Sequence, residues 1–207
     1  MMLEKYWNIL SDSYEGYFNY LVNEIASPMI HNYFYGMIVV SLFFLVVEQV
    51  WPWRKDQPRI RKDFWLDGFY MFFNFFIFQL LLFAAVSNIA SALFNDFLGL
   101  FGVTNIVAVS VGKLPGWVQL LAMFFLRDFI QFNIHRLLHR SDFLWEFHKV
   151  HHSVKQMGFA AQMRFHWMEN VVYRTLEYIP LGMIGFGLTD FFIVHMFAFF
   201  VGHFNHA

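Results

Sequence analysis

Apolar residues run in long, nearly unbroken blocks along this chain, rather than in the alternation of half-buried strands. Residues 32–50 are apolar until Glu48 and Gln49, and a second block covers residues 64–94. A helix of about 20 apolar residues spans the roughly 30 Å hydrocarbon core of a bilayer. We therefore predict a transmembrane helix in each block, with the second long enough to tilt.

The segments around these blocks predict the topology. The basic residues of segment 54–62 place it in the cytoplasm by the positive-inside rule. Residues 95–115, rich in glycine, predict an external connection, from which a third span leads inward to His135. Residues 171–187 and 190–206 predict a helical hairpin that dips into the bilayer and returns to the cytoplasmic face. The expected fold is all-α, a multi-pass transmembrane helical bundle of about four or five spans.

No internal repeat or low-complexity segment divides the chain, so we predict a single domain. It comprises a membrane portion (residues 1–134), a cytoplasmic histidine-rich helical cap (residues 135–170) and the C-terminal hairpin (residues 171–207). His31, at the outer start of the first span, is expected to be an interfacial residue.

Composition supports the membrane class. The chain is 58% hydrophobic and 14% charged, with 30 phenylalanines, whereas soluble domains are about 45–50% apolar and about 25% charged. Its net charge of −1 and the absence of a long Lys/Arg run argue against a nucleic-acid partner. There is no cysteine, which excludes thiolate ligands, iron–sulfur clusters and cysteine nucleophiles.

The segment HRLLHRSDFLWEFHKVHH, residues 135–152, holds five of the ten histidines. His135 and His139 are four residues apart, so they share one face of a helix. A second group, at spacings of three and four residues, also shares a face: His148, His151 and His152. Two such faces brought together present five imidazoles to one small volume, and imidazole ligates iron, zinc, copper and nickel. We predict a metal site here rather than a solvated basic loop.

Other polar residues lie where they can support this site. Asp128 stands two helical turns before the first histidine, and we expect it either to fix the tautomer of a ligand by accepting an imidazole N–H or to pair with Arg127 in helix packing. His203 and His206 return to the cytoplasmic face as further candidate ligands. His195, two turns deeper, is expected to make an interhelical hydrogen bond or to line a substrate cavity, with metal ligation as the alternative.

These motifs resemble those of the fatty acid hydroxylase superfamily, which includes sterol desaturases, methyl-sterol oxidases and alkylglycerol monooxygenase. The resemblance rests on HRLLH (135–139), HKVHHS (148–153) and the aspartate seven residues before the first histidine. It continues through MRFHWMEN (163–170) and the C-terminal FNHA. It covers residues 115–207.

The resemblance implies a membrane-embedded non-haem di-metal oxygenase, normally di-iron, with its metal site on the cytosolic side. The implied ligands are His135, His139, His148, His151, His152 and His206. His166 and Glu169 match a recurrent R-F-H-x-x-E pattern. For these two we expect a role beside the ligands or the substrate, against plain hydrogen bonding at a helix surface.

The expected function is O₂-dependent hydroxylation or desaturation of a lipid: a sterol, a fatty acyl chain or an ether lipid. Cleaving an unactivated C–H bond requires a redox metal, while the protein supplies position. We expect two iron ions, for which zinc can substitute in overexpressed protein. A b-type cytochrome or a ferredoxin with its reductase would supply electrons, as the resemblance implies. The expected location is a bacterial inner membrane or the endoplasmic reticulum.

Other functions fit the histidine spacing. One is a zinc-dependent membrane hydrolase with Glu169 as general base, although H-E-x-x-H is absent and the imidazoles outnumber the three ligands of usual catalytic zinc. A haem-binding electron-transfer protein and a structural membrane protein with a histidine-rich loop are further alternatives. The superfamily's third cluster, H-x-x-H-H or Q-x-x-H-H, does not follow FNHA. We therefore expect this sequence to be a fragment or a truncated form that lacks some of the ligands.

Overall fold

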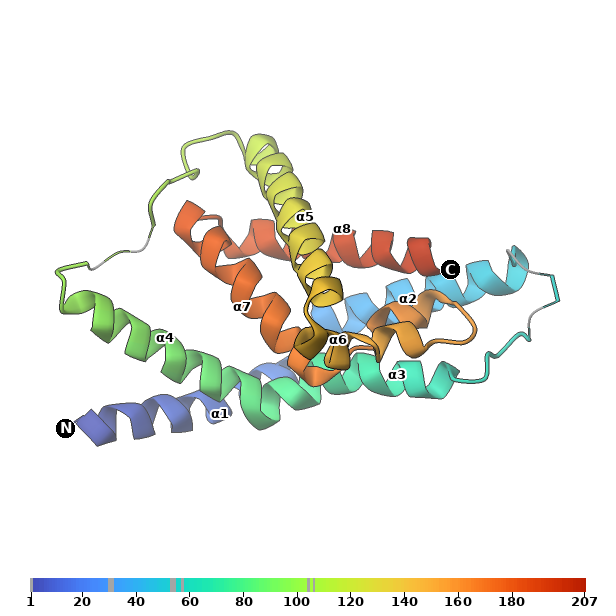
Figure 1. The fold of residues 1–207 in the computed structure, drawn as a ribbon, viewed down its shortest axis with the longest axis horizontal. Coiled ribbons are helices and arrows are strands. Elements are labelled where there is room, and N and C mark those ends of the chain that lie inside the picture. Colours follow the sequence, from blue (N-terminus) through green and yellow to red (C-terminus); the bar gives the residue numbers. More distant parts are fainter. Residues whose placement is uncertain (1, 30–31, 53–54, 57, 104, 106) are drawn as a thin grey trace. The chain divides into compact units, whose positions relative to one another are not determined.

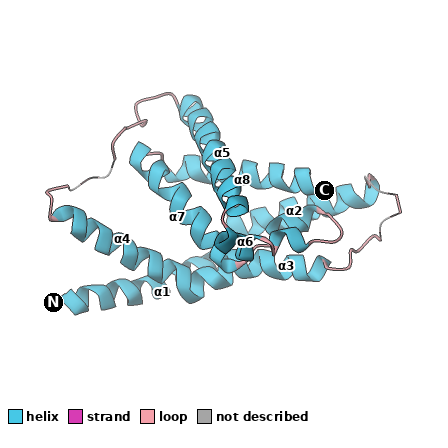
Figure 2. Ribbon diagram, in the orientation of Figure 1, coloured by secondary structure: helices cyan, strands magenta, loops and turns pink. Residues whose placement is uncertain are grey.

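The structure, a computed structural model, describes residues 2–29, 32–52, 55–56, 58–103, 105 and 107–207. The expectations for His31 and for Arg54 in the basic segment fall outside these residues. The described chain consists of helices and connecting segments without a strand (Figure 2), so the all-α prediction is confirmed.

The chain divides into two compact units, Met1–Tyr35 with Phe72–Ile106, and Gly36–Met71 with Val107–Ala207. All the candidate site residues lie in the second unit. The prediction that the whole chain is one domain stays a prediction.

The first unit contains helix α1 (Met2–Ala26) and a helical segment of two π-helical turns that lead into α4: η1 (Phe73–Ile77), η2 (Gln79–Phe83) and α4 (Ala84–Gly99). Lys5 Nζ of α1 pairs with Asp96 Oδ2 of α4 at 2.5 Å. Asn88 Nδ2 donates to Ser13 Oγ at 2.9 Å. Because positions rise along α1 as they fall along α4, the two helices run antiparallel.

Tyrosines of α1 bond the π-helical turns. The Tyr17 hydroxyl donates to the carbonyl of Phe75 at 3.0 Å, and the Tyr14 hydroxyl donates to the carbonyl of Leu81 at 2.9 Å. Backbone carbonyls in an apolar setting need such partners, particularly where the regular α-helical ladder is interrupted.

The second unit holds the remaining elements: most of α2 (Tyr33–Val50) and α3 (Phe64–Phe72), then α5 (Gly116–Arg140), α6 (Asp142–His148), η3 (His151–Ser153), η4 (Phe159–Met163), α7 (Trp167–Ile184) and α8 (Leu188–His206). Helix α5 packs against α7 and α8 (Figure 1). The buried side chains of Met123, Leu181 and Val194 form a core cluster of these three helices. The turn between α7 and α8 contains Gly185, at φ +68°, a left-handed conformation that favours glycine. This is the hairpin that the two C-terminal apolar blocks predicted.

Two helices are long and apolar enough to cross a membrane, Tyr33–Val50 and Phe64–Gly99, by length and composition alone. This is fewer than the four or five predicted from the sequence, among the residues described. In the second unit, α5 and α7 carry polar and charged side chains toward each other, including Arg127 and Glu177. Such residues lower the mean hydropathy of a helix even when its outer face is apolar.

Candidate metal centre

A tight reversal of the chain brings the histidines together. Helix α5 carries His135 and His139 on its last turns and stops at Ser141. The Ser141 hydroxyl accepts a hydrogen bond from the N–H of Leu144 and caps α6. Helix α6 is only seven residues long and ends at His148, so the following turn returns beside the end of α5.

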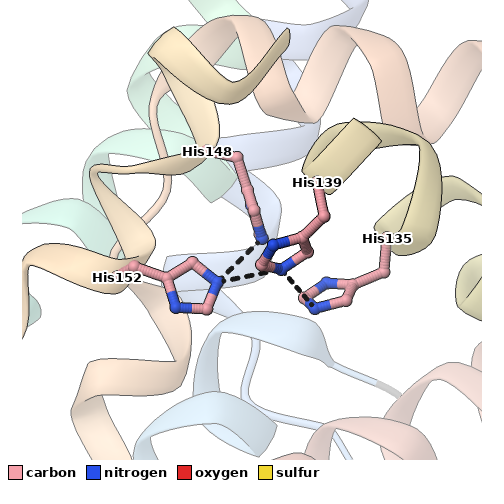
Figure 3. Close-up of side chains that lie close together, drawn as sticks. All are labelled: His135, His139, His148 and His152. Carbon is pink, nitrogen blue, oxygen red and sulfur yellow. Dashed lines mark hydrogen bonds between the residues drawn. The ribbon is translucent and has the colours of Figure 1, made fainter. Parts of the chain in front are cut away.

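Four histidines converge in this space: His135, His139, His148 and His152 (Figure 3). One ring nitrogen from each lies within 4.8 Å of the others. The Nε2 atom of His139 is 3.1 Å from that of His135, and the Nε2 of His152 lies 3.1 Å and 3.2 Å from those of His148 and His139. Imidazole–metal bonds of about 2.0–2.1 Å place tetrahedral ligand atoms about 3.3 Å apart. The observed spacings fit such a cation.

Three imidazoles of this group have lowered pKa values, which favours their neutral form. Burial, followed by the neighbouring histidines, lowers the pKa of His135 to about 4. Burial also lowers the pKa of His148 and, with the adjacent His148 and His139, that of His152. Neutral imidazole is the form that binds metal. Several lone pairs directed into one small volume repel each other unless a cation lies among them.

Glu169 is the acid that meets the cluster. Its Oε1 lies 2.9 Å from Nδ1 of His148, with each side chain 1% exposed. Its Oε2 is buried and has no hydrogen-bond partner among the residues described. Burial raises the pKa of Glu169 to about 8. An imidazole that bonds a carboxylate through Nδ1 presents Nε2 to a metal.

Asp128 was the acid predicted to fix the tautomer of a ligand, and the structure places it away from the histidines. Asp128 is exposed, and within the described part of the chain it makes no hydrogen bond to a histidine. It shares a face of α5 with His135, but seven residues of helix separate the two by about 10 Å along the axis. The role expected of Asp128 falls to a side chain from another helix.

His151 and His206 form a second pair beside the first group. Their ring centroids are 5.7 Å apart, and the His151 ring lies 5.6 Å from that of His148. The Nδ1 of His151 is buried without a hydrogen-bond partner in the described structure. Burial, then the adjacent His206, lowers the pKa of His151 to about 3. His206 donates through Nδ1 to the carbonyl of Gly202 at 2.8 Å, which leaves its Nε2 as the basic atom.

His203, the other candidate ligand on α8, differs from the expectation. It is fully buried; its Nδ1 faces the Gln162 side-chain oxygen, and its Nε2 lies 3.5 Å from the Ser41 hydroxyl. Because both ring nitrogens have partners, we remove His203 from the candidate ligands. It joins α8 to η4 and α2 instead.

Two further histidines also have structural partners. Nδ1 of His195 lies 3.3 Å from Nη2 of Arg127, the interhelical contact that was one of its expected roles. His166 caps α7, because its Nδ1 accepts a hydrogen bond from the N–H of Met168 at 3.2 Å. This is the plainer of the two roles considered for His166.

Sequence reasoning missed two aromatic residues at the cluster. The Tyr173 hydroxyl lies 3.3 Å from Nδ1 of His135. The Trp145 ring lies 5.2 Å and 5.4 Å, between centroids, from the rings of His139 and His152. A signal for Tyr173 was present, since it follows Glu169 by four residues and therefore shares its helix face.

Four histidines that converge beside a buried acid in an apolar helical unit are an arrangement typical of helical metal-binding proteins. Residues 120–207 match the fatty acid hydroxylase family. The chain is 31% identical over 93 residues to the ornithine lipid hydroxylase OlsE of Rhizobium tropici. The match covers 45% of this chain and 28% of that relative. No solved structure matches the chain.

Proposed function

We propose that this protein is a membrane-bound, iron-dependent oxygenase that uses O₂ to hydroxylate or desaturate a lipid. The observation that carries the proposal is the convergence of four imidazole nitrogens within 4.8 Å, inside the region that matches the fatty acid hydroxylase family. When bound, iron supplies the redox chemistry needed at an unactivated C–H bond, which side chains lack.

The donor set suits a dinuclear site. His135, His139, His148 and His152 would hold one ion, and Glu169 would orient His148. A second ion would draw its donors from the adjacent His151 and His206 and from Oε2 of Glu169, which makes no hydrogen bond in the described structure. Nitrogen donors of this kind also accept zinc, which would occupy the site in overexpressed protein.

The outer face of α5 supports a multi-pass membrane location. Five large apolar side chains are exposed along one side of this helix: Trp117, Leu121, Phe125, Phe129 and Phe132. A continuous exposed apolar stripe suits contact with acyl chains. With α5 and the α7–α8 hairpin added to the two apolar helices, the chain would enter the bilayer four or five times. The metal site would then face the cytoplasm of a bacterium or of a cell with endoplasmic reticulum.

The proposed substrate is a lipid with an acyl or polycyclic apolar part. The relative from Rhizobium tropici is named for hydroxylation of an ornithine lipid, so an ornithine-containing lipid is the first substrate to test. Electrons would come from a b-type cytochrome or a ferredoxin with its reductase.

Metal analysis and absorption spectroscopy of the purified chain test the proposal. We expect iron near two per chain, O₂ consumption that depends on lipid and reductant, and a product that has gained one oxygen atom or lost two hydrogens. His148→Ala and His152→Ala should lose iron and activity together, whereas His166→Ala, which removes a helix cap, should keep its iron. A Soret band would instead identify a haem protein, and lipid hydrolysis without O₂ uptake would identify a zinc hydrolase.

A further inference from the structure

Three polar side chains stand four residues apart along one face of α7: Glu169, Tyr173 and Glu177. Two of them face candidate metal ligands. Oε1 of Glu169 lies 2.9 Å from Nδ1 of His148, and the Tyr173 hydroxyl lies 3.3 Å from Nδ1 of His135. Helix α7 therefore contacts the Nδ1 atom of one histidine from α6 and the Nδ1 atom of another from α5.

The third member of the row ties α7 to α5. Oε1 of Glu177 pairs with Nε of Arg127 at 2.6 Å, the two side chains being 5% and 8% exposed. Oε2 of Glu177 accepts from Nε2 of Gln131 at 3.1 Å. Arg127, Gln131 and His135 are themselves four residues apart, so two polar rows face each other. Because an unpaired buried charge is costly, this pairing holds the helices in register and keeps Tyr173 opposite His135.

The two ring nitrogens of His135 point to different places. Its Nε2 lies 3.1 Å from Nε2 of His139, inside the cluster, while its Nδ1 faces the tyrosine. A neutral imidazole carries one N–H, so the atom that bonds Tyr173 decides which nitrogen keeps its lone pair. When the phenol oxygen accepts Nδ1–H, the lone pair on Nε2 is directed into the cluster.

We infer that Tyr173 is a positioning residue: it accepts the Nδ1–H of His135 and holds that imidazole in the tautomer and orientation that present Nε2 to a metal ion. The inference rests on the proposed function, since it assigns the metal to this cluster. Tyr173 and Glu169 then do the same task one helical turn apart, for ligands from α5 and α6. The opposite arrangement, with the phenol donating to Nδ1, would put a proton on Nε2 and block coordination by His135.

Cobalt(II) titration of the metal-free protein in detergent tests this, because Co²⁺ binding is followed by absorbance without turnover. Tyr173→Phe removes only the hydroxyl and should weaken Co²⁺ binding by about tenfold, the lower end of the effect of losing a partner of a ligand. Tyr178→Phe is the matched control. It lies on the same helix, and its hydroxyl makes no hydrogen bond within the described structure.

Proton NMR of the Co²⁺ form supplies a readout that a general loss of packing would not imitate. Imidazoles bound through Nε2 keep an Nδ1–H whose signal is strongly shifted by Co²⁺ and exchanges with water. Among the four clustered histidines, two such signals should exchange slowly in the wild-type protein, one held by Glu169 and one by Tyr173. Glu169→Gln should perturb one of them, and Tyr173→Phe should accelerate exchange of the other.

Each outcome decides the inference. Co²⁺ affinity of Tyr173→Phe within twofold of wild type, with both slow signals retained, would overturn it while leaving the proposed metal site intact. If Tyr173→Phe does not fold, the wild-type spectrum decides alone, because a single protected Nδ1–H among the four clustered histidines contradicts the assignment. A wild-type protein that binds no Co²⁺ overturns the proposed function and this inference together.

Discussion

Gly158→Ala isolates one buried ion pair of the second unit. A Cβ built on Gly158 would lie 1.1 Å from Nη1 and 1.9 Å from Cζ of Arg61, so the guanidinium cannot stay where it is. The backbone itself accepts alanine, because Gly158 is extended, at φ −174° and ψ 164°. The whole effect of the substitution should therefore arise from displacing Arg61.

Displacing the guanidinium of Arg61 removes the ion-pair partner of the Glu48 carboxylate. Nη2 of Arg61 lies 2.7 Å from Oε1 of Glu48, and the two side chains are 9% and 10% exposed. Breaking a buried pair by removing one partner costs about 3–5 kcal/mol. Glu48 keeps the N–H of Phe159 at 2.7 Å, and Arg61 can reach solvent, so we expect about 2–3 kcal/mol. For a chain of this size, that lowers the midpoint of thermal unfolding by about 4–12 °C.

Thermal unfolding in detergent measures this in a double-mutant cycle. Once Arg61→Ala has removed the guanidinium, adding Gly158→Ala should change the midpoint little, because nothing remains to be displaced. Gly182→Ala is the control: a Cβ there meets no atom within 4 Å, and alanine in a helix should not lower the midpoint. Equal effects of Gly158→Ala with and without Arg61 would refute the reasoning.

Three further results are expected. Glu169→Gln should weaken Co²⁺ binding by about ten- to a hundredfold, and a titration unchanged from wild type would contradict its contact with the ligand. His203→Ala should lower the unfolding midpoint but keep the metal content per chain, whereas His206→Ala should lower metal content; equal metal loss in both would restore His203 as a ligand. Burial lowers the pKa of His135 to about 4 and of His151 to about 3, while unfolded histidine titrates near 6.5. The unfolded state then binds more protons, so the stability of the metal-free protein should fall as the pH drops from 6.5 toward 4; a constant unfolding midpoint over this range would contradict these shifts.

Much of the fold was predictable because it depends on local pattern. The apolar block at residues 32–50 became α2 (Tyr33–Val50), and the block at 64–94 became the helical stretch Phe64–Gly99. The four-residue spacing of His135 and His139 predicted that both lie on one face of a helix, because residues four apart share a helix face. In the structure this face is at the end of α5. The two π-helical turns in the second block were not predictable, because they depend on contacts with another helix.

The partners of the histidines depend on tertiary structure, and there the sequence was ambiguous. His203 and His206 are three residues apart on α8, and spacing treats them alike. Packing distinguishes their roles, because the side chains of Gln162 and Ser41 face the two ring nitrogens of His203.

The choice between Asp128 and Glu169 shows why a shared helix face is not sufficient for a hydrogen bond. Two turns along one helix leave about 10 Å between residues, which no carboxylate can close, so an acid on the ligand's own helix must stand within one turn. A second helix has no such restriction. Glu169 lies in the first turn of α7, three residues after the cap at His166, and residues four and eight positions later fall on the same face. An acid in the first turn of a helix that packs beside the ligands is therefore a stronger candidate than one on their own helix, and its i+4 neighbour, here Tyr173, is the next position to consider.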